Sequence, residues 1–347
     1  MLTRRTARSL LAVAAAAGVI TSLAVAPGMA GAASSTASAK VFWVNPVQSS
    51  GDESLTDQND SATAVPAKDY RTVTLTNLDG SGYLNGDYAS VVSDTGKAAF
   101  AAPGGPYNYN RHDDQFEQVM AYYWVTQAQL YIQSLGFGST LPAVNKRQQL
   151  VRINQYGGDN SFYRPGKGRL TITFGKGGVD DAEDAEVIDH EYGHSVQDNQ
   201  VPGFGSSLDA GSIGEAFGDY LAVEVGLHVA GAPADGLPAA CVADWDSTSY
   251  TSDVPHCLRR VDTNLTVADR IGEVHFDGQI WSRALWDIRN ALGPALADKI
   301  IIDAQFDFAP DTSFRAAALA TVAAASRFGG TKAANAATAA FQARGIL

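Results

Sequence analysis

The segment His190-Glu191-Tyr192-Gly193-His194, followed by Gly214-Glu215-Ala216-Phe217-Gly218-Asp219, decides how this chain folds. In a helix, His190 and His194 are four residues apart, so both imidazoles leave the same face. Two histidines and a later glutamate, here Glu215, are a common catalytic zinc set that leaves the fourth position for water. The alternative is a chance HExxH string with core histidines, which is rare in a chain of 347 residues with six His. The sequence therefore predicts a zinc site built from two helices.

Two further acids near these ligands predict the chemistry of the site. Glu191 follows the first histidine, where it can accept a proton from a zinc-bound water and later pass it to a leaving amine. Asp219 lies four residues after Glu215 on the same helical face, so we expect it to accept the free N–H of His190 and fix its tautomer. A surface acid is the alternative for Asp219. The prediction is a hydrolase in which zinc-bound water attacks a peptide carbonyl.

The first 32 residues have the pattern of a secretory signal. Arg4, Arg5 and Arg8 precede an apolar run from Leu10 to Ala26, and Ala30-Gly31-Ala32 suits cleavage. A single N-terminal membrane anchor is the alternative, but the run falls just short of spanning length. We therefore expect a secreted, extracellular protein, exported by either the general or the twin-arginine route.

Charge and cysteine content restrict the partners and the compartment. The formal net charge is -12, and removal of the three signal arginines gives -12 - 3 = -15. An acidic surface argues against nucleic acid and anionic membranes as partners. We expect a monomer that acts on protein or peptide substrates. The two cysteines, Cys241 and Cys257, predict a disulfide in an exported chain, with two free buried thiols as the alternative.

The pattern along the chain divides it into four parts. Residues 1–32 form the signal, and residues 33–95 form a linker and a small N-terminal β region, in which residues 33–40 read as a disordered linker. Residues 96–200 hold a long helix from Asp113 to Leu135, short strands from Val151 to Phe174, and the zinc helix. Residues 201–347 read as mostly helical, with helices expected at 211–225, 277–292, 294–306, 312–328 and 332–344.

At this point the motifs resemble a known group of enzymes. HEYGH, GSIGEAFGDYLAVE, CLRRVD and EVHFDGQIWSRALW resemble the fungalysin-like and thermolysin-like zinc metallopeptidases of the Glu-zincin clan. NSFY, DGSGYLNGDY and FEQVMAYY extend the similarity from about Leu78 to the end of the chain. The resemblance implies an α+β, two-lobed zincin fold. An N-terminal lobe would hold an antiparallel sheet and the zinc helix, a C-terminal lobe would be mostly helical, and substrate would lie in the cleft between them.

The resemblance also implies roles for four residues outside the zinc motifs. His275 would donate a hydrogen bond to the oxyanion that develops in the transition state. Arg259, with Arg260 as a close competitor, would hold the substrate carbonyl after the scissile bond. Asn160 and Ser161 would bind the peptide backbone by strand addition. Interior cleavage of an extended chain, that is endopeptidase activity, is the expected reaction.

The sequence departs from the thermolysin-like pattern at several points. Gly214 stands where those enzymes have Asn, so no partner is assigned to the second nitrogen of His194. No tyrosine matches their oxyanion-assisting residue. Calcium is a further expectation, with Asp184, Glu186 and Glu224 as the candidate ligands and a solvated acidic face as the alternative. Two other functions stay open: a catalytically idle zinc-stabilised binding module, and a zinc hydrolase of a non-peptide amide or ester.

Overall fold

The structure is a computed structural model that describes residues 35–93, 95–102, 104–154, 157–165, 170–234 and 236–347. The expected signal, residues 1–32, lies outside these residues. Within them, no helix has both the length and the apolar character needed to cross a membrane. The described chain forms one compact unit, and one large hydrophobic cluster runs through it from Ala37 to Ile346.

The first half of the chain carries most of the strands. Its elements are β1 (Ser35–Phe42), α1 (Pro46–Ser50), η1 (Ala67–Asp69), β2 (Tyr70–Leu78), β3 (Ala89–Ser93), α2 (Asp114–Ser134), β4 (Gln149–Ile153), β5 (Ser161–Arg164) and β6 (Thr171–Phe174). The second half is mainly helical. Its elements are η2 (Asp181–Glu183), α3 (Ala185–Gln200), α4 (Leu208–Ala230), β7 (Cys241–Val242), η3 (Asp246–Ser249), β8 (Arg259–Arg260), η4 (Val267–Asp269), α5 (Val274–Leu292), α6 (Pro294–Ala304), η5 (Gln305–Asp307) and α7 (Phe314–Ala343).

The main sheet is mixed, which corrects the expectation of an antiparallel one. Its strand order is β3-β4-β6-β5, with β3, β4 and β6 parallel and only the edge strand β5 antiparallel to β6. The physical reason is the connection between strands: α2 lies between β3 and β4 in the chain, and such a long crossover joins parallel neighbours. Only the short β5–β6 connection forms a hairpin. Strand β5 therefore lies at the edge of the sheet, where the sequence predicted a substrate-binding edge strand.

Residues 35–40 are a strand, so the expectation of a disordered linker was wrong for them. In β1, Ala37, Ala39 and Val41 are buried while the residues between them face outward. This alternation is that of a strand with one buried face. Strand β1 pairs antiparallel with β2 in a separate two-stranded sheet.

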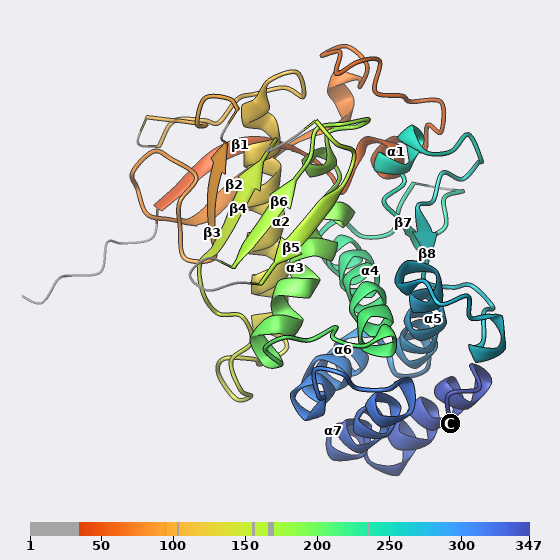
Figure 1. The fold of residues 1–347 in the computed structure, drawn as a ribbon. Coiled ribbons are helices and arrows are strands. Elements are labelled where there is room, and N and C mark those ends of the chain that lie inside the picture. The colour runs from red at the N-terminus through yellow and green to blue at the C-terminus, as the bar shows by residue number, and fades with distance from the viewer. Residues whose placement is uncertain (1–34, 94, 103, 155–156, 166–169, 235) are drawn as a thin grey trace, which may run out of the picture. The chain divides into compact units, whose positions relative to one another are not determined.

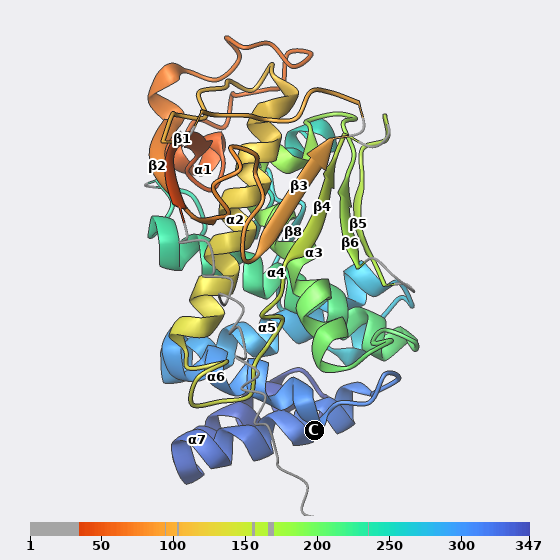
Figure 2. The ribbon, with the colours of Figure 1, turned by 90° about the vertical axis from the view of Figure 1, so that its left-hand side faces the viewer.

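Helix α2 occupies the centre of the protein. Most of its side chains are buried, among them Phe116, Trp124 and Ile132, as expected for a helix surrounded by other elements. It contacts β3, β4 and α3, while α3 contacts β5 and β6. Figure 1 shows the sheet towards one end of the described chain, α5, α6 and α7 towards the other, and α3 with α4 between them. Figure 2 shows α2 running along one face of the sheet.

The C-terminal helices follow the expected pattern with one difference. The helices expected at 312–328 and 332–344 form a single element, α7, that is interrupted at Gly330, whose φ of 64° lies in the left-handed region. Glycine adopts this conformation without steric cost, so the chain can change direction there. The N-terminus of α5, which carries His275, is capped by Glu273, whose side chain accepts hydrogen bonds from His275 N and Phe276 N.

Candidate metal centre and active site

Helix α3 presents its two histidines side by side. The helix starts at Ala185, where the Asp184 side chain accepts a hydrogen bond from Glu186 N and acts as the N-cap. The imidazoles of His190 and His194 lie edge to face, and their Nε2 atoms are 3.1 Å apart. The spacing of four residues therefore gives the arrangement that the sequence predicted.

Helix α4 brings Glu215 to the same point. Its Oε2 lies 3.3 Å from His190 Nε2, and its Oε1 lies 3.5 Å from His194 Nε2. Ligand atoms bound about 2.0–2.1 Å from a tetrahedral zinc ion are about 3.3 Å from one another. The three groups therefore have the donor types and the spacing of a zinc site. Among the described residues, two clusters of His or acidic side chains have ligand atoms within 4.8 Å of one another, and this is one of them.

The electrostatics of the three groups favour a positive charge between them. Although burial lowers it, the pKa of His190 is raised to about 10 by hydrogen bonds to Asp219 and Glu215. Burial lowers the pKa of His194 to about 4. Burial raises the pKa of Glu215, but the neighbouring His194 and His190 outweigh it and hold that pKa far below its usual value. A cation would be held here by an ionised carboxylate and two nitrogen donors.

Asp219 lies behind His190, on the side away from the cavity. Its Oδ1 is 2.8 Å from His190 Nδ1, so an ionised Asp219 accepts the Nδ1–H and leaves Nε2 directed at the other two ligand groups. Arg259 binds the same carboxylate through both Nε and Nη2, each at 2.7 Å. Burial raises the pKa of Asp219, but Arg259 and His190 outweigh it and keep the carboxyl ionised.

Glu191 lines the cavity and is almost fully buried. Its Oε2 has no hydrogen-bond partner among the described residues, and burial raises its pKa to about 7. An unpartnered carboxylate oxygen next to the two histidines is free to take a proton from a reacting molecule.

His275 reaches the same place from the first turn of α5. Its Nδ1 lies 2.6 Å from Glu273 Oε1, and its Nε2 lies 3.3 Å from Glu215 Oε2. The side chain is 52% exposed, so it lies at the mouth of the site rather than in the core. This position argues against a purely structural role for His275.

A cavity of about 520 Å³ joins these groups. Its lining includes almost every residue that the sequence singled out, whereas Asp219 lies outside it. The predicted residues in the lining are Asn160, Ser161, His190, Glu191, His194, Glu215, Arg259 and His275.

Gln197 lies near His194, although no hydrogen bond joins their side chains among the described residues. A Cβ at Gly214 would lie 3.5 Å from Gln197 Oε1 and 3.7 Å from His194 Nδ1, so both groups flank this glycine. The side chain of Gln197 is buried, and neither of its polar atoms has a hydrogen-bond partner among the described residues. The i,i+3 spacing from His194 was the signal in the sequence that could have identified it.

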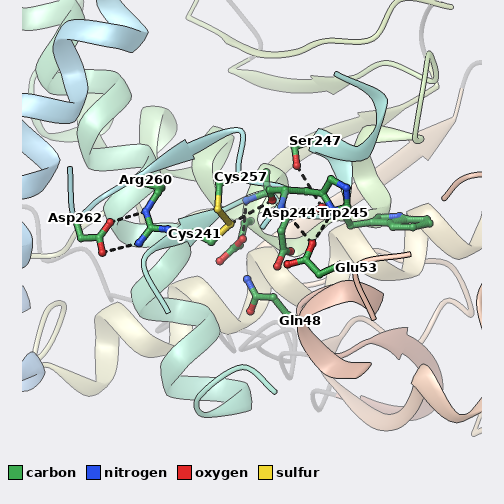
Figure 3. The surroundings of a disulfide bond; sticks show 12 residues. Gln48, Glu53, Cys241, Asp244, Trp245, Ser247, Cys257, Arg260 and Asp262 are labelled. Atoms are coloured by element: carbon green, nitrogen blue, oxygen red, sulfur yellow. Dashed lines mark hydrogen bonds and ion pairs between the residues drawn. A yellow bond between two sulfur atoms is a disulfide. The ribbon is translucent and has the colours of Figure 1, made fainter. Parts of the chain in front are cut away.

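The expected disulfide is present and lies beside the site. Cys241 is bonded to Cys257 (Figure 3). Cys241 is in β7 and pairs with Arg260 of β8, and Cys257 precedes Arg259 by two residues. The bond therefore ties together the two-stranded ribbon that presents Arg259 to Asp219. Arg260, the competitor in the sequence prediction, binds Asp262 instead.

The expected calcium ligands do not come together. Glu224 binds Arg289 at 2.7 Å. Asp184 accepts hydrogen bonds from Asn45 and from backbone N–H groups. Among the described residues, Asp184, Glu186 and Glu224 do not form a cluster whose ligand atoms lie close enough to bind one ion. The prediction was wrong because it relied on acidic residue types without the buried donors that surround each carboxylate.

A second cluster of acids, which the sequence analysis missed, lies beside the same cavity, and two of its three members, Asp181 and Asp246, line it. It consists of Asp159, Asp181 and Asp246, and one carboxylate oxygen of each lies within 4.8 Å of the others. Their separation in the chain, with Asp159 before β5 and Asp246 after β7, left no local pattern to detect.

Comparison with known proteins supports the fold. No family model and no curated protein sequence matches the chain. Among solved structures, the chain is similar to the precursor of protealysin, a metalloproteinase from Serratia proteamaculans, with 21% sequence identity and a TM-score of 0.52. The match covers 75% of this chain and 86% of that one. The protein therefore has a mixed α+β fold shared with a metalloproteinase precursor.

Proposed function

We propose that the protein is a secreted zinc metalloendopeptidase. The observation that carries this proposal is the convergence of His190, His194 and Glu215 at ligand spacing, with the unpartnered oxygen of Glu191 in the same cavity. The fold shared with a metalloproteinase precursor supports it. A zinc ion held by these three residues would supply Lewis-acid chemistry, acidifying a water molecule and polarising a carbonyl group.

The side chains of the site divide the remaining work among them. Glu191 accepts the proton of the attacking water at its Oε2 and returns it to the leaving amine. His275 donates from Nε2 to the oxygen on which negative charge develops. Asp219 fixes the orientation of His190, and Arg259 in turn holds Asp219. The edge strand β5, with Asn160 and Ser161 at its start, would pair with an extended peptide.

The competing functions predict different observations. Burying a carboxylate such as Glu191 costs free energy. A role in a reaction accounts for its presence in the cavity, whereas a zinc-stabilised binding module would not need it. A hydrolase of a non-peptide amide or ester would use the same residues on another substrate. The exposed edge of β5 favours a peptide, because backbone hydrogen bonds along a strand recognise an extended chain.

The test is digestion of a diverse peptide library by the secreted protein, read by mass spectrometry, with zinc content measured in parallel. Cleavage at interior bonds, lost with a chelator and restored by zinc, is expected. The variant Glu191→Gln should keep its zinc and lose activity by roughly 10²–10⁴-fold. Stoichiometric zinc without cleavage of any peptide would favour the binding module. Turnover of esters alone would favour the non-peptide hydrolase.

A further inference from the structure

The three aspartates Asp159, Asp181 and Asp246 form an acidic recess beside the cavity: Asp181 and Asp246 line it, and one carboxylate oxygen of Asp159 lies within 4.8 Å of theirs. They come from three separate segments: the loop before β5, the start of η2 and the start of η3. Asp181 accepts a hydrogen bond from Ser161 Oγ, and Asp159 accepts one from Tyr250 Oη at 2.6 Å. These contacts fix two of the carboxylates in place and leave acceptor capacity unused.

The recess gathers buried carboxyl groups that have no cationic partner of their own in the described part of the chain, and a bound cation would favour their ionised form. Asp181 is 2% exposed and Asp246 is 4% exposed, and the Oδ1 atom of each has no hydrogen-bond partner among the described residues. Burial raises the pKa of Asp181 to about 8, and burial together with the neighbouring acids raises that of Asp246. The opposing charge of Arg259 also acts on Asp246, but Arg259 is already bound by Asp219 through two hydrogen bonds.

Buried acceptors without a partner carry a free-energy cost that a bound donor removes. Both unpartnered oxygens belong to residues that line the cavity in which Glu191 and the zinc ligands lie. Asp181 and Glu191 line this one cavity together. The cavity lining also includes the apolar side chains of Val187, Val242 and Leu258. Apolar and acidic residues in one lining match a long side chain that ends in a positive charge.

We propose that the acidic recess binds the cationic end of a lysine or arginine side chain in the peptide substrate, at a residue that flanks the scissile bond. This inference rests on the proposed peptidase function. It makes Asp246 and its two neighbours the residues that determine the specificity of the enzyme. An ammonium group has three donors, which match the three carboxylates of the recess. A calcium ion instead requires six to eight oxygen ligands, and two of the six carboxylate oxygens here already accept hydrogen bonds from Ser161 and Tyr250.

The test compares two peptides that differ at one flanking residue, lysine in one and norleucine in the other. Norleucine has nearly the same shape without the charge, so the ratio of kcat/KM values isolates the ammonium group. We expect lysine to be favoured at least about 10²-fold, because removing one member of a desolvated charge pair has an effect of this size. In the peptide library, lysine and arginine should be enriched at a position flanking the cut.

Two variants and a control locate the effect. Asp246→Asn and Asp159→Asn should each lower the ratio of lysine to norleucine cleavage, and the melting temperature of each is measured to exclude unfolding. Asp262→Asn, a partly exposed acid paired with Arg260, should leave the ratio unchanged. Agreement between the two recess variants guards against a structural effect of either one.

Three outcomes would overturn the inference. Cleavage of both peptides at equal rates, with no basic enrichment in the library, would leave the proposed peptidase function intact and remove the specificity. If lysine is not preferred and calorimetry with calcium alone shows tight binding that Asp246→Asn abolishes, the recess is a metal site instead. Failure to cleave any peptide in the zinc-loaded protein would reject the peptidase function first, and the inference with it.

Discussion

Two glycines of helix α4, four residues apart, should respond in opposite ways to the same substitution. A Cβ at Gly218 would lie 2.7 Å from His190 Nδ1 and 2.9 Å from two carbons of the same ring. A Cβ at Gly214 would lie no closer than 3.5 Å to any neighbouring atom. Gly218→Ala therefore forces His190, the first proposed zinc ligand, to move, whereas Gly214→Ala makes ordinary van der Waals contacts.

The structure gives the size of each effect. Alanine in a helix interior is favoured over glycine by about 1 kcal/mol, and both positions gain this amount. At position 218 the ring of His190 must shift by roughly 0.8 Å to reach a normal separation of about 3.5 Å, and overpacking of this kind costs about 1–3 kcal/mol. A functional site tolerates displacements of about 0.5 Å. Gly214→Ala should thus be stabilising by about 1 kcal/mol, and Gly218→Ala should be neutral or destabilising by up to about 2 kcal/mol.

The assay measures two quantities on each variant. Urea unfolding with zinc chelated gives the free energy of unfolding of the metal-free protein, and competition with a chromogenic chelator gives the zinc affinity. Gly218→Ala should lower zinc affinity by about 10-fold or more, because the orientation of His190 is disturbed, and Gly214→Ala should leave it nearly unchanged. If both variants have the same stability and the same zinc affinity, the close approach of α3 and α4 at Gly218 does not set the geometry of the site.

Three other substitutions test individual contacts. Asp219→Asn should lower zinc affinity by about 10–100-fold and reduce stability, because it weakens the hydrogen bond to His190 and leaves the buried guanidinium of Arg259 facing an amide. The matched control is Asp262→Asn, because the partly exposed Asp262 also binds an arginine through two hydrogen bonds. Equal effects of the two substitutions would refute the argument. His275→Phe should keep zinc content and melting temperature and lower kcat by about 10²–10³-fold with little change in KM, so that a normal kcat would exclude it from the oxyanion site. Gln197→Leu should maintain or raise the melting temperature, since it removes a buried unpartnered amide, and should leave zinc affinity nearly unchanged because no hydrogen bond joins Gln197 to His194. A loss of zinc affinity of about 10-fold or more would contradict this and show that the amide supports His194.

The sequence predicted those parts of the site that local helical geometry determines. The positions of His190 and His194 on one face follow from their spacing alone. The contact between Asp219 and His190 forms only when α3 and α4 pack together. The sequence nevertheless predicted it, because the i,i+4 spacing places Asp219 on the same face of α4 as Glu215. The glycines of both motifs explain the packing, since a Cβ at Gly193 would lie only 2.9 Å from Gly218 Cα. The distance between the helices was thus encoded in the motifs, although spacing alone did not reveal it.

The strands at the N-terminus and in the main sheet were harder to predict, for two physical reasons. The alternation in β1 uses alanine and serine, whose difference in hydrophobicity is small, so residues 35–40 read as a linker although Ala37 and Ala39 are buried. The direction of β4 and β6 depends on pairing between segments far apart in the chain. No local signal distinguishes a parallel neighbour from an antiparallel one when the strands are only four or five residues long.

The acidic recess could not be predicted from the sequence, because its three aspartates are far apart in the chain. Asp181 lies among the acids before α3, where a solvated acidic face is the ordinary interpretation, and Asp246 follows Trp245 at the start of η3. The three carboxylates come within 4.8 Å of one another only after the fold has brought together the sheet edge, the start of η2 and the segment after β7. Burial then changes their meaning, because acids that water would solvate on a surface become unsatisfied acceptors in a cavity wall. The residues of the proposed zinc site can be recognised from the spacing of two helical motifs, whereas the contacts of the acidic recess exist only in the folded chain.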